Sequence, residues 1–172
     1  MNARTFGFIV ALIVFALDQF TKYWVTGPLG VNHIGDQLYL IPNFQFTYTE
    51  NNGISLGLLN ATTEIGRWML VGLTSAIAIG VAWWLGREKN RIDQVALGMV
   101  LGGALGNILD RTRHGYVVDF ADLHFGEWRP FLIFNVGDAA ISIAVVILLL
   151  RAFLSRKDHE TGGDAQGDIE HA

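Results

Sequence analysis

Long apolar runs alternate with short polar segments along the chain. Four runs are long enough for a helix to cross a bilayer core of roughly 30 Å, which takes about 20 residues. They lie at about residues 6–24, 68–86, 92–110 and 131–152. The first carries Asp18 and Lys22 and no small-residue cleavage site follows it, so we interpret it as a membrane helix and not as a cleaved leader. The pattern predicts an all-α membrane protein, a bundle of four transmembrane helices.

A different period appears between the first two runs. Polar and apolar residues alternate around 38–41 and 43–49, with turn residues at Gly35-Asp36 and Asn52-Gly53. A period of two with such turns is typical of short strands. We therefore expect a small β-rich cap at about residues 30–60. In the third run, the spacing of Gly98, Gly102 and Gly106 predicts close approach to a neighbouring helix.

Basic residues are unevenly distributed between the loops. Segment 25–65 contains no Lys or Arg, whereas Arg and Lys occur before the first run, in the 87–91 loop and after residue 150. Because cytoplasmic loops carry the excess of basic residues, we expect both termini and the 87–91 loop in the cytoplasm. Segments 25–65 and 111–130 then face the outer side of the membrane. Arg113 and Arg129 weaken this bias without reversing it.

Composition separates a membrane domain, residues 1–157, from a tail. The chain is 51% hydrophobic, and five of its sixteen acidic residues follow Lys157, the last basic one. The tail, 158–172, is acidic and without periodicity, so we expect it to be disordered and cytoplasmic. No basic patch with interleaved aromatic residues suggests a nucleic-acid partner. The absence of cysteine excludes disulfides and thiol catalysis.

Polar residues gather at one expected depth, the outer membrane boundary. They are Asp18, Lys22, Asn107, Asp110, Arg111, Asp119, Asn135 and Asp138. A charge inside the bilayer costs about 2.5–3.5 kcal/mol on insertion scales, so each needs a reason. Taken alone, Asp18 and Lys22 fit a structural ion pair, and Asp110 with Arg111 fits a solvated helix end. Asp138 fits neither description, because it has no cation within four residues in an apolar run.

Two carboxylates in such a cluster support acid–base hydrolysis. Carboxylates held close share one proton, because both cannot ionise easily. The ionised member can activate water, and the protonated member can polarise a carbonyl and protonate the leaving amine. We predict Asp119, on a loop, and Asp138, on a helix, as this pair. Asn107, Arg111 and Asn135 would orient them or bind substrate.

Other sites are less well supported. Gly53–Gly57 matches a serine nucleophile elbow, but that motif requires a large α/β sheet for which this chain has no room. The five histidines lack the H-E-x-x-H spacing, so we expect neither a metal nor another cofactor. A proton-relay or transporter subunit, and a non-enzymatic scaffold, remain as alternatives.

Several motifs resemble those of the bacterial lipoprotein signal peptidases, or signal peptidase II. The matching segments are Asp18–Lys22, Asn51–Gly53, Gly102–Arg111, Val117–Phe120 and Phe134–Ala139. Their order and spacing fit the family over about residues 5–155. The resemblance implies an intramembrane aspartyl endopeptidase that removes signal peptides from diacylglyceryl-modified prolipoproteins, cutting before the lipidated cysteine.

The resemblance also implies residue roles and ligands. The catalytic pair falls on Asp119 and Asp138. The supporting or substrate-binding positions are Asp18, Lys22, Asn51, Gly53, Asn107, Asp110, Arg111 and Asn135. Expected partners are the prolipoprotein substrates, membrane lipid and globomycin-like inhibitors, and we expect a monomer. The run Ile54–Gly57 departs from the family pattern, which bears on how the cap packs on substrate.

Overall fold

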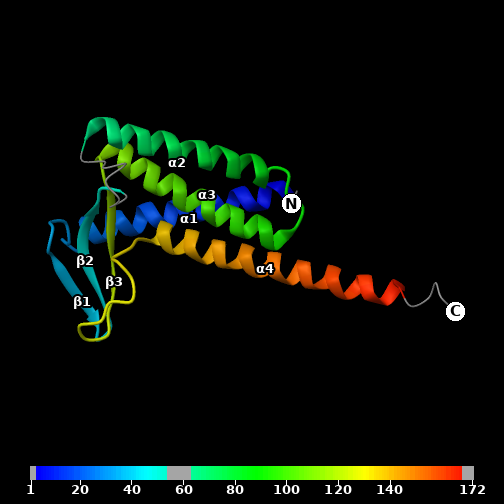
Figure 1. Cartoon of the computed structure of the whole chain (residues 1–172). Coiled ribbons are helices and arrows are strands. Elements are labelled where there is room, and N and C mark those ends of the chain that lie inside the picture. The colour runs from blue at the N-terminus through cyan, green and yellow to red at the C-terminus, as the bar shows by residue number, and fades with distance from the viewer. Residues whose placement is uncertain (1–2, 54–62, 168–172) are drawn as a thin grey trace.

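The computed structural model describes residues 3–53 and 63–167. Its helices are α1 (Ala3–Thr26), α2 (Glu64–Leu85), α3 (Arg91–Arg113) and α4 (Val136–Gly167), and its strands are β1 (Gln37–Ile41), β2 (Phe44–Asn51) and β3 (Val117–Leu123). The helices lie side by side, and the sheet covers one end of the bundle (Figure 1). Each helix contains a stretch of 19 to 23 residues that is long and apolar enough to cross a membrane. The predicted four-helix membrane bundle with a small β cap is confirmed.

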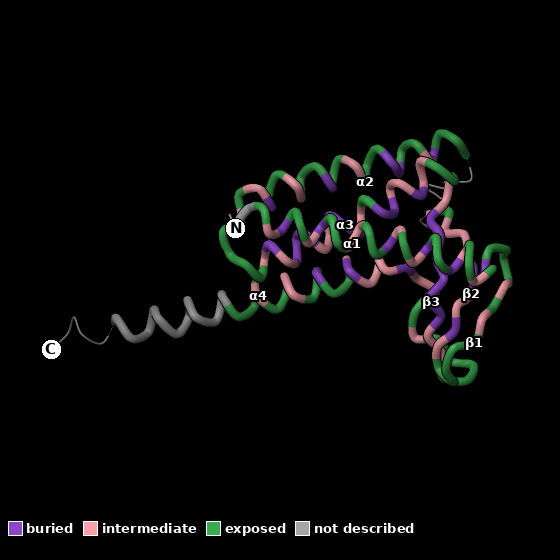
Figure 2. Tube along the Cα trace, turned by 180° about the vertical axis from the view of Figure 1, so that it is seen from behind, coloured by how far each residue is buried: buried purple, intermediate pink, exposed green. Residues whose placement is uncertain are grey.

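Helix α3 is the centre of the bundle. In its membrane stretch 44% of the residues are buried, against 17–22% in the other three helices. Figure 2 shows many exposed positions along the other helices. Large apolar residues occupy many of these positions, as expected of surfaces that contact lipid. The glycine spacing in this segment predicted close approach to a neighbouring helix, and α3 approaches α1 closely at these glycines. A Cβ at Gly98 or Gly102 would collide with backbone carbonyls of α1.

Gly102→Ala is expected to lower the free energy of unfolding by about 1–3 kcal/mol, the usual cost of overpacking a tight interface. The new methyl group would meet the carbonyl oxygen of Ala11 and lie 2.8 Å from Cβ of Val14. Gly80→Ala is the matched control, because a Cβ at Gly80 meets nothing within 4 Å. Thermal unfolding in detergent measures both. Equal transition midpoints for the two variants would contradict the tight α1–α3 contact.

The cap is an antiparallel sheet with the strand order β1-β2-β3. Strands β1 and β2 lie in the expected β-rich segment, where Leu38 pairs with Phe46. Strand β3 was expected as loop. Its run of apolar residues does not alternate, because six of its seven residues are buried between β2 and the bundle. Buried residues from α1, β2 and β3 form one apolar cluster, which fixes the sheet on the bundle.

Helix α4 differs from its predicted bounds at both ends. It begins at Val136 and not at 131, because Phe134 pairs with Ala121 of β3 as a short extended bridge after Pro130. It continues to Gly167, through most of the segment expected to be disordered. An existing helix gains one backbone hydrogen bond per added residue without a new nucleation cost, which favours this extension. Residues 168–172 lie outside the described part of the chain.

Helix α2 begins at Glu64, four residues before the expected start. Thr63 caps it, since the Thr63 hydroxyl accepts a hydrogen bond from the Gly66 N–H at 3.1 Å. This cap satisfies a backbone donor that the first helical turn leaves without a partner. The departure noted at Ile54–Gly57, and with it most of the serine-elbow pattern, lies outside the described residues.

Candidate active site

A buried ion cluster joins α1 to α3 near the sheet. Lys22 Nζ lies 2.8 Å from Oδ2 of Asp18 and 2.8 Å from Oδ2 of Asp110. All three side chains are at most 6% exposed. Lys22 also donates to Oδ1 of Asn107 at 3.2 Å. The ion pair expected within α1 is therefore one half of a larger cluster, in which a single cation serves two acids.

The two acids of this cluster also hold the neighbouring elements in place. Asp18 Oδ1 accepts the Gly137 N–H at 2.9 Å, which fixes the first turn of α4. Asp110 Oδ2 accepts the Val118 N–H at 3.1 Å, which fixes β3. Gly106 must lack a side chain here, because a Cβ would collide with the Asp18 carboxylate. The ion cluster thus sets the position of both segments that carry the predicted catalytic acids.

Asn135 connects those two acids. Its Oδ1 caps α4 by accepting the Asp138 N–H at 2.9 Å, and Asp138 Oδ2 accepts the Asn135 N–H at 3.3 Å in return. Its Nδ2 donates to Oδ1 of Asp119 at 2.6 Å and to Oδ1 of Asn107 at 3.1 Å. Asn107 in turn donates to Oδ1 of Asp138 at 2.8 Å. Two amide side chains therefore orient both carboxylates.

Asp119 lies in β3 opposite Thr49 and is 1% exposed. Its Oδ2 accepts from Nδ2 of Asn51 at 3.0 Å, and Oδ1 of Asn51 accepts the Gly53 N–H at 2.9 Å. Gly53 has φ of +98°, a backbone conformation that favours glycine. Asn51 therefore links the backbone at Gly53 to the Asp119 carboxylate.

The pKa of Asp119 is raised to about 7, mainly because the carboxyl is buried and secondly because Asp138 carries a nearby negative charge. Hydrogen bonds from Asn51 and Asn135 and the charge of Lys22 oppose this rise only in part. Asp119 is therefore poised to exchange a proton near neutral pH. A carboxyl with this pKa, next to a second carboxyl, is suited to acid–base catalysis.

Two hollows meet at the acids. The outer cleft, of about 530 Å³, is lined by Asp119, Asn51, Thr49, Arg129 and residues 130–133. The helix cleft, of about 350 Å³, is lined by Asp138, Phe134, residues 131–132 and three further residues of α4. Phe131 and Leu132 line both. An extended chain that occupied both clefts would therefore contact both carboxylates.

Comparison with known proteins identifies the family of this chain. The family model described as signal peptidase (SPase) II matches residues 10–154. The chain belongs to the signal peptidase II family. A protein from Sphingopyxis alaskensis named lipoprotein signal peptidase is 52% identical over 149 residues, 87% of this chain and 86% of the relative. One of the same name from Rhizorhabdus wittichii is 51% identical over 154 residues, 90% and 89% of the two chains.

Two solved structures have a similar fold. One described as a bacterial membrane enzyme has a TM-score of 0.72 at 29% identity and covers 96% of this chain and 93% of that chain. A second with the same description has a TM-score of 0.72 at 30% identity, with 85% and 91% covered. Signal peptidase II is a protease family, so the transporter and scaffold alternatives are set aside.

In this signal peptidase II chain, Arg111 differs from the other predicted site residues. Its charge interacts with Asp138, Asp119 and Asp110, yet its Nε is buried without a hydrogen-bond partner among the described residues.

Gln19 was missed by sequence reasoning. It donates to Oδ2 of Asp18 at 3.2 Å and to Oδ1 of Asp110 at 3.0 Å. Gln19 follows Asp18 within the first segment that matches the family, and this position could have identified it as a site residue.

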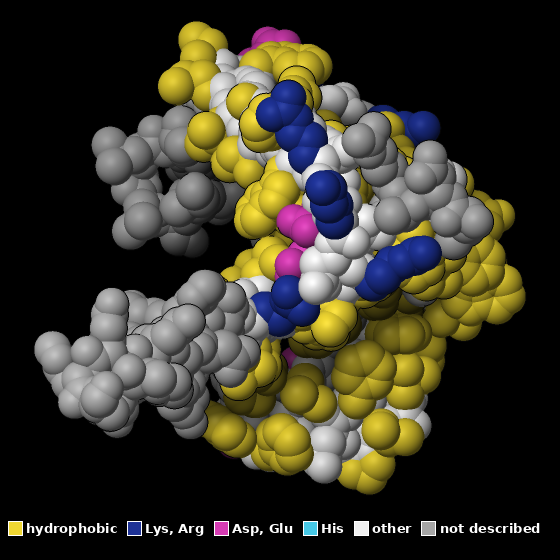
Figure 3. Space-filling model, turned by 90° about the vertical axis from the view of Figure 1, so that its right-hand side faces the viewer, with side chains coloured by type: hydrophobic (Ala, Val, Ile, Leu, Met, Phe, Trp, Pro, Cys, Tyr) yellow, Lys and Arg dark blue, Asp and Glu magenta, His cyan; other side chains and the backbone are white. Residues whose placement is uncertain are grey.

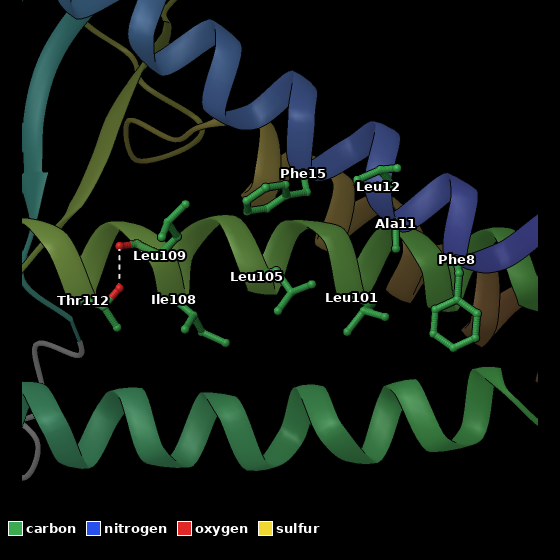
Figure 4. A pocket seen from close by; sticks show the side chains of 9 residues that line it. All are labelled: Phe8, Ala11, Leu12, Phe15, Leu101, Leu105, Ile108, Leu109 and Thr112. Carbon is green, nitrogen blue, oxygen red and sulfur yellow. Dashed lines mark hydrogen bonds between the residues drawn. The ribbon is translucent and has the colours of Figure 1, made fainter.

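A third hollow lies away from the acids. This groove of about 510 Å³ runs between α1 and α3, with α2 alongside (Figure 4). Its lining is apolar apart from Thr112, whose hydroxyl donates to the Leu109 carbonyl at 2.8 Å. None of its lining residues is titratable, so it contributes no catalytic group to the signal peptidase II site.

Proposed function

We propose that this chain removes signal peptides from diacylglyceryl-modified prolipoproteins, with Asp119 and Asp138 as the catalytic pair. One observation carries this proposal: Asn135 hydrogen-bonds to both carboxyl groups, and these groups line two adjoining clefts. The ionised member takes a proton from water as the water attacks the scissile carbonyl. The protonated member donates a hydrogen bond to the carbonyl oxygen and then protonates the leaving amine. Neither step uses a metal or another cofactor.

The supporting residues act on this pair through position and charge. Asn51, Asn107 and Asn135 hold the carboxyl oxygens in fixed directions, which keeps the attack geometry. The Lys22 cluster holds β3 and α4 in register. Arg111 moderates the negative charge around the acids. Each contribution is a positioning or electrostatic effect, because none of these groups transfers the proton.

The membrane orientation belongs to the same proposal. The sheet end faces the periplasm of the inner membrane, and both termini face the cytoplasm. Arg87, Lys89 and Arg91 cluster between α2 and α3 at the end opposite the sheet, and Arg151 lies on α4 near them, where it pairs with Asp93 at 2.8 Å. Basic side chains gather on that end (Figure 3). This distribution supports a cytoplasmic location for that end.

The assay for this function uses purified protein in proteoliposomes and two forms of one prolipoprotein, with and without the diacylglyceryl group. We expect cleavage only of the lipidated form, with the lipidated cysteine as the new N-terminus by mass spectrometry. We also expect globomycin to inhibit the reaction and a monomer to carry it. Equal cleavage of both forms, or a cut elsewhere, would contradict the proposed substrate.

The rate is expected to fall as the pH rises above about 7. Asp119 has its pKa raised to about 7, so above that pH the pair loses the shared proton that protonates the leaving group. The expected decline in kcat/KM approaches tenfold per pH unit. Initial rates between pH 6 and 9 at constant ionic strength measure it. A rate that stays constant to pH 9 would rule out a proton of this pKa in the reaction.

A further inference from the structure

Arg129 is held in a fixed direction at the wall of the outer cleft. Its Nε lies 3.1 Å from Oδ1 of Asp122, and its Nη2 lies 3.5 Å from Oδ2. The side chain of Asp122 is 1% exposed, whereas that of Arg129 is 47% exposed. The carboxylate therefore lies behind the guanidinium, and the remaining N–H donors of Arg129 are available on the exposed side.

The carboxylate that holds Arg129 is itself fully engaged. Asp122 Oδ2 also accepts from Nε2 of Gln45 at 2.9 Å and from Oγ1 of Thr47 at 3.1 Å. Burial raises the pKa of Asp122, but the hydrogen bonds from Arg129, Gln45 and Thr47 outweigh this effect and lower it. Asp122 is thus ionised at neutral pH and anchors a cation. The catalytic steps above use neither residue.

The two clefts differ in what part of a substrate they fit. The helix cleft reaches Ser142 and Ile143, which lie about 6–8 Å further along α4 than Asp138. That cleft extends along the first turns of the membrane-spanning stretch of α4 and suits an apolar signal peptide. The outer cleft contains no residue of a spanning stretch and holds Arg129 and Asp119. It suits the polar chain on the other side of the scissile bond.

We propose that Arg129 is a specificity-determining residue that favours acidic over basic side chains just after the lipidated cysteine. This inference rests on the proposed function. The catalytic pair, when it shares one proton, carries one negative charge, which the guanidinium of Arg111 partly compensates. Asp122 is buried behind Arg129, so the exposed side of this ion pair presents only N–H donors to the cleft. These donors favour a substrate carboxylate through hydrogen bonds and disfavour Lys or Arg, whose side chains have no acceptor.

The test compares kcat/KM for three lipidated prolipoproteins that carry Asp, Asn or Lys at the two positions after the cysteine. The wild type is expected to prefer Asp over Lys by about three- to fivefold, which is the effect of one partly exposed charge pair. Arg129→Gln should abolish or reverse this preference, and Arg129→Glu should favour Lys. Arg129→Lys should retain part of it. Arg113→Gln, an exposed arginine at the same end of the bundle, should leave it unchanged.

The Asn substrate separates specificity from folding. If Arg129→Gln slows all three substrates equally, or if its Asp-to-Lys ratio equals that of the wild type, the inference is wrong and the Arg129–Asp122 pair is only structural. If the wild type cleaves none of the three substrates, the proposed function fails instead. A change in the Asp-to-Lys ratio with the Asn rate retained supports the inference.

Discussion

Asp119→Asn and Asp138→Asn are each expected to lower kcat/KM for a lipidated prolipoprotein by at least about 10³-fold, to the background rate. An amide has nearly the shape of a carboxylate but cannot accept or donate the catalytic proton. Each carboxylate accepts hydrogen bonds on both oxygens, and the single amide oxygen keeps one of them, from Asn51 at position 119 or from Asn107 at position 138. With the side-chain shape and one hydrogen bond retained, the fold should persist. The loss should lie in kcat, because neither carboxylate is needed to hold the acyl chains or the signal peptide.

Asp36→Asn is the matched control for both substitutions. Asp36 accepts the backbone N–H groups of Asn32 and His33 near the exposed edge of the cap, and asparagine keeps an acceptor there. We expect wild-type rates and the same thermal unfolding midpoint. Activity that survives in either dyad variant, with the protein correctly inserted, would eliminate the proton-sharing mechanism.

The membrane helices were predictable because lipid demands long apolar runs wherever a chain crosses it. The start of α4 was not predictable from hydropathy. Phe131 and Leu132 are as apolar as the residues of a helix, but they are exposed in the clefts, and Phe134 bridges to β3. Apolarity alone does not distinguish a residue that faces lipid from one that lines a site for an apolar substrate.

Strand β3 and the connections within the site depend on contacts distant in sequence. Asp119 pairs with Thr49 across 70 positions, and no local pattern specifies that register. The sequence predicted that the polar residues lie at a common depth, because the expected topology determines which helix ends are at the same membrane boundary. It did not indicate that Lys22 contacts Asp110 as well as Asp18, or that Gln19 reaches Asp110. Those links follow from side-chain packing, which sequence spacing within one helix does not describe.

Lys22→Met is expected to lower the free energy of unfolding by about 3–5 kcal/mol, the largest stability effect that this structure suggests. The substitution leaves Asp18 and Asp110 buried within a membrane protein without the cation that both contact at 2.8 Å. Removing one partner of a buried ion pair costs this much because the remaining charge is uncompensated. Two carboxylates here depend on one ammonium group, so the effect should fall at the upper end of that range.

Thermal and denaturant unfolding in detergent, compared with Lys89→Met, provides the measurement. Lys89 is exposed in the loop between α2 and α3, so its replacement removes the same charge without disturbing a buried pair.

A triple variant, Lys22→Met with Asp18→Asn and Asp110→Asn, tests whether the uncompensated carboxylates cause the loss of stability. Neutral amides keep acceptors for the Gly137 and Val118 N–H groups, so the triple variant should recover part of the lost stability. If Lys22→Met is as stable as Lys89→Met, the cluster is not what holds β3 and α4 together. If the triple variant is no more stable than Lys22→Met, the loss comes from packing around the lysine stem, and charge compensation is not its cause.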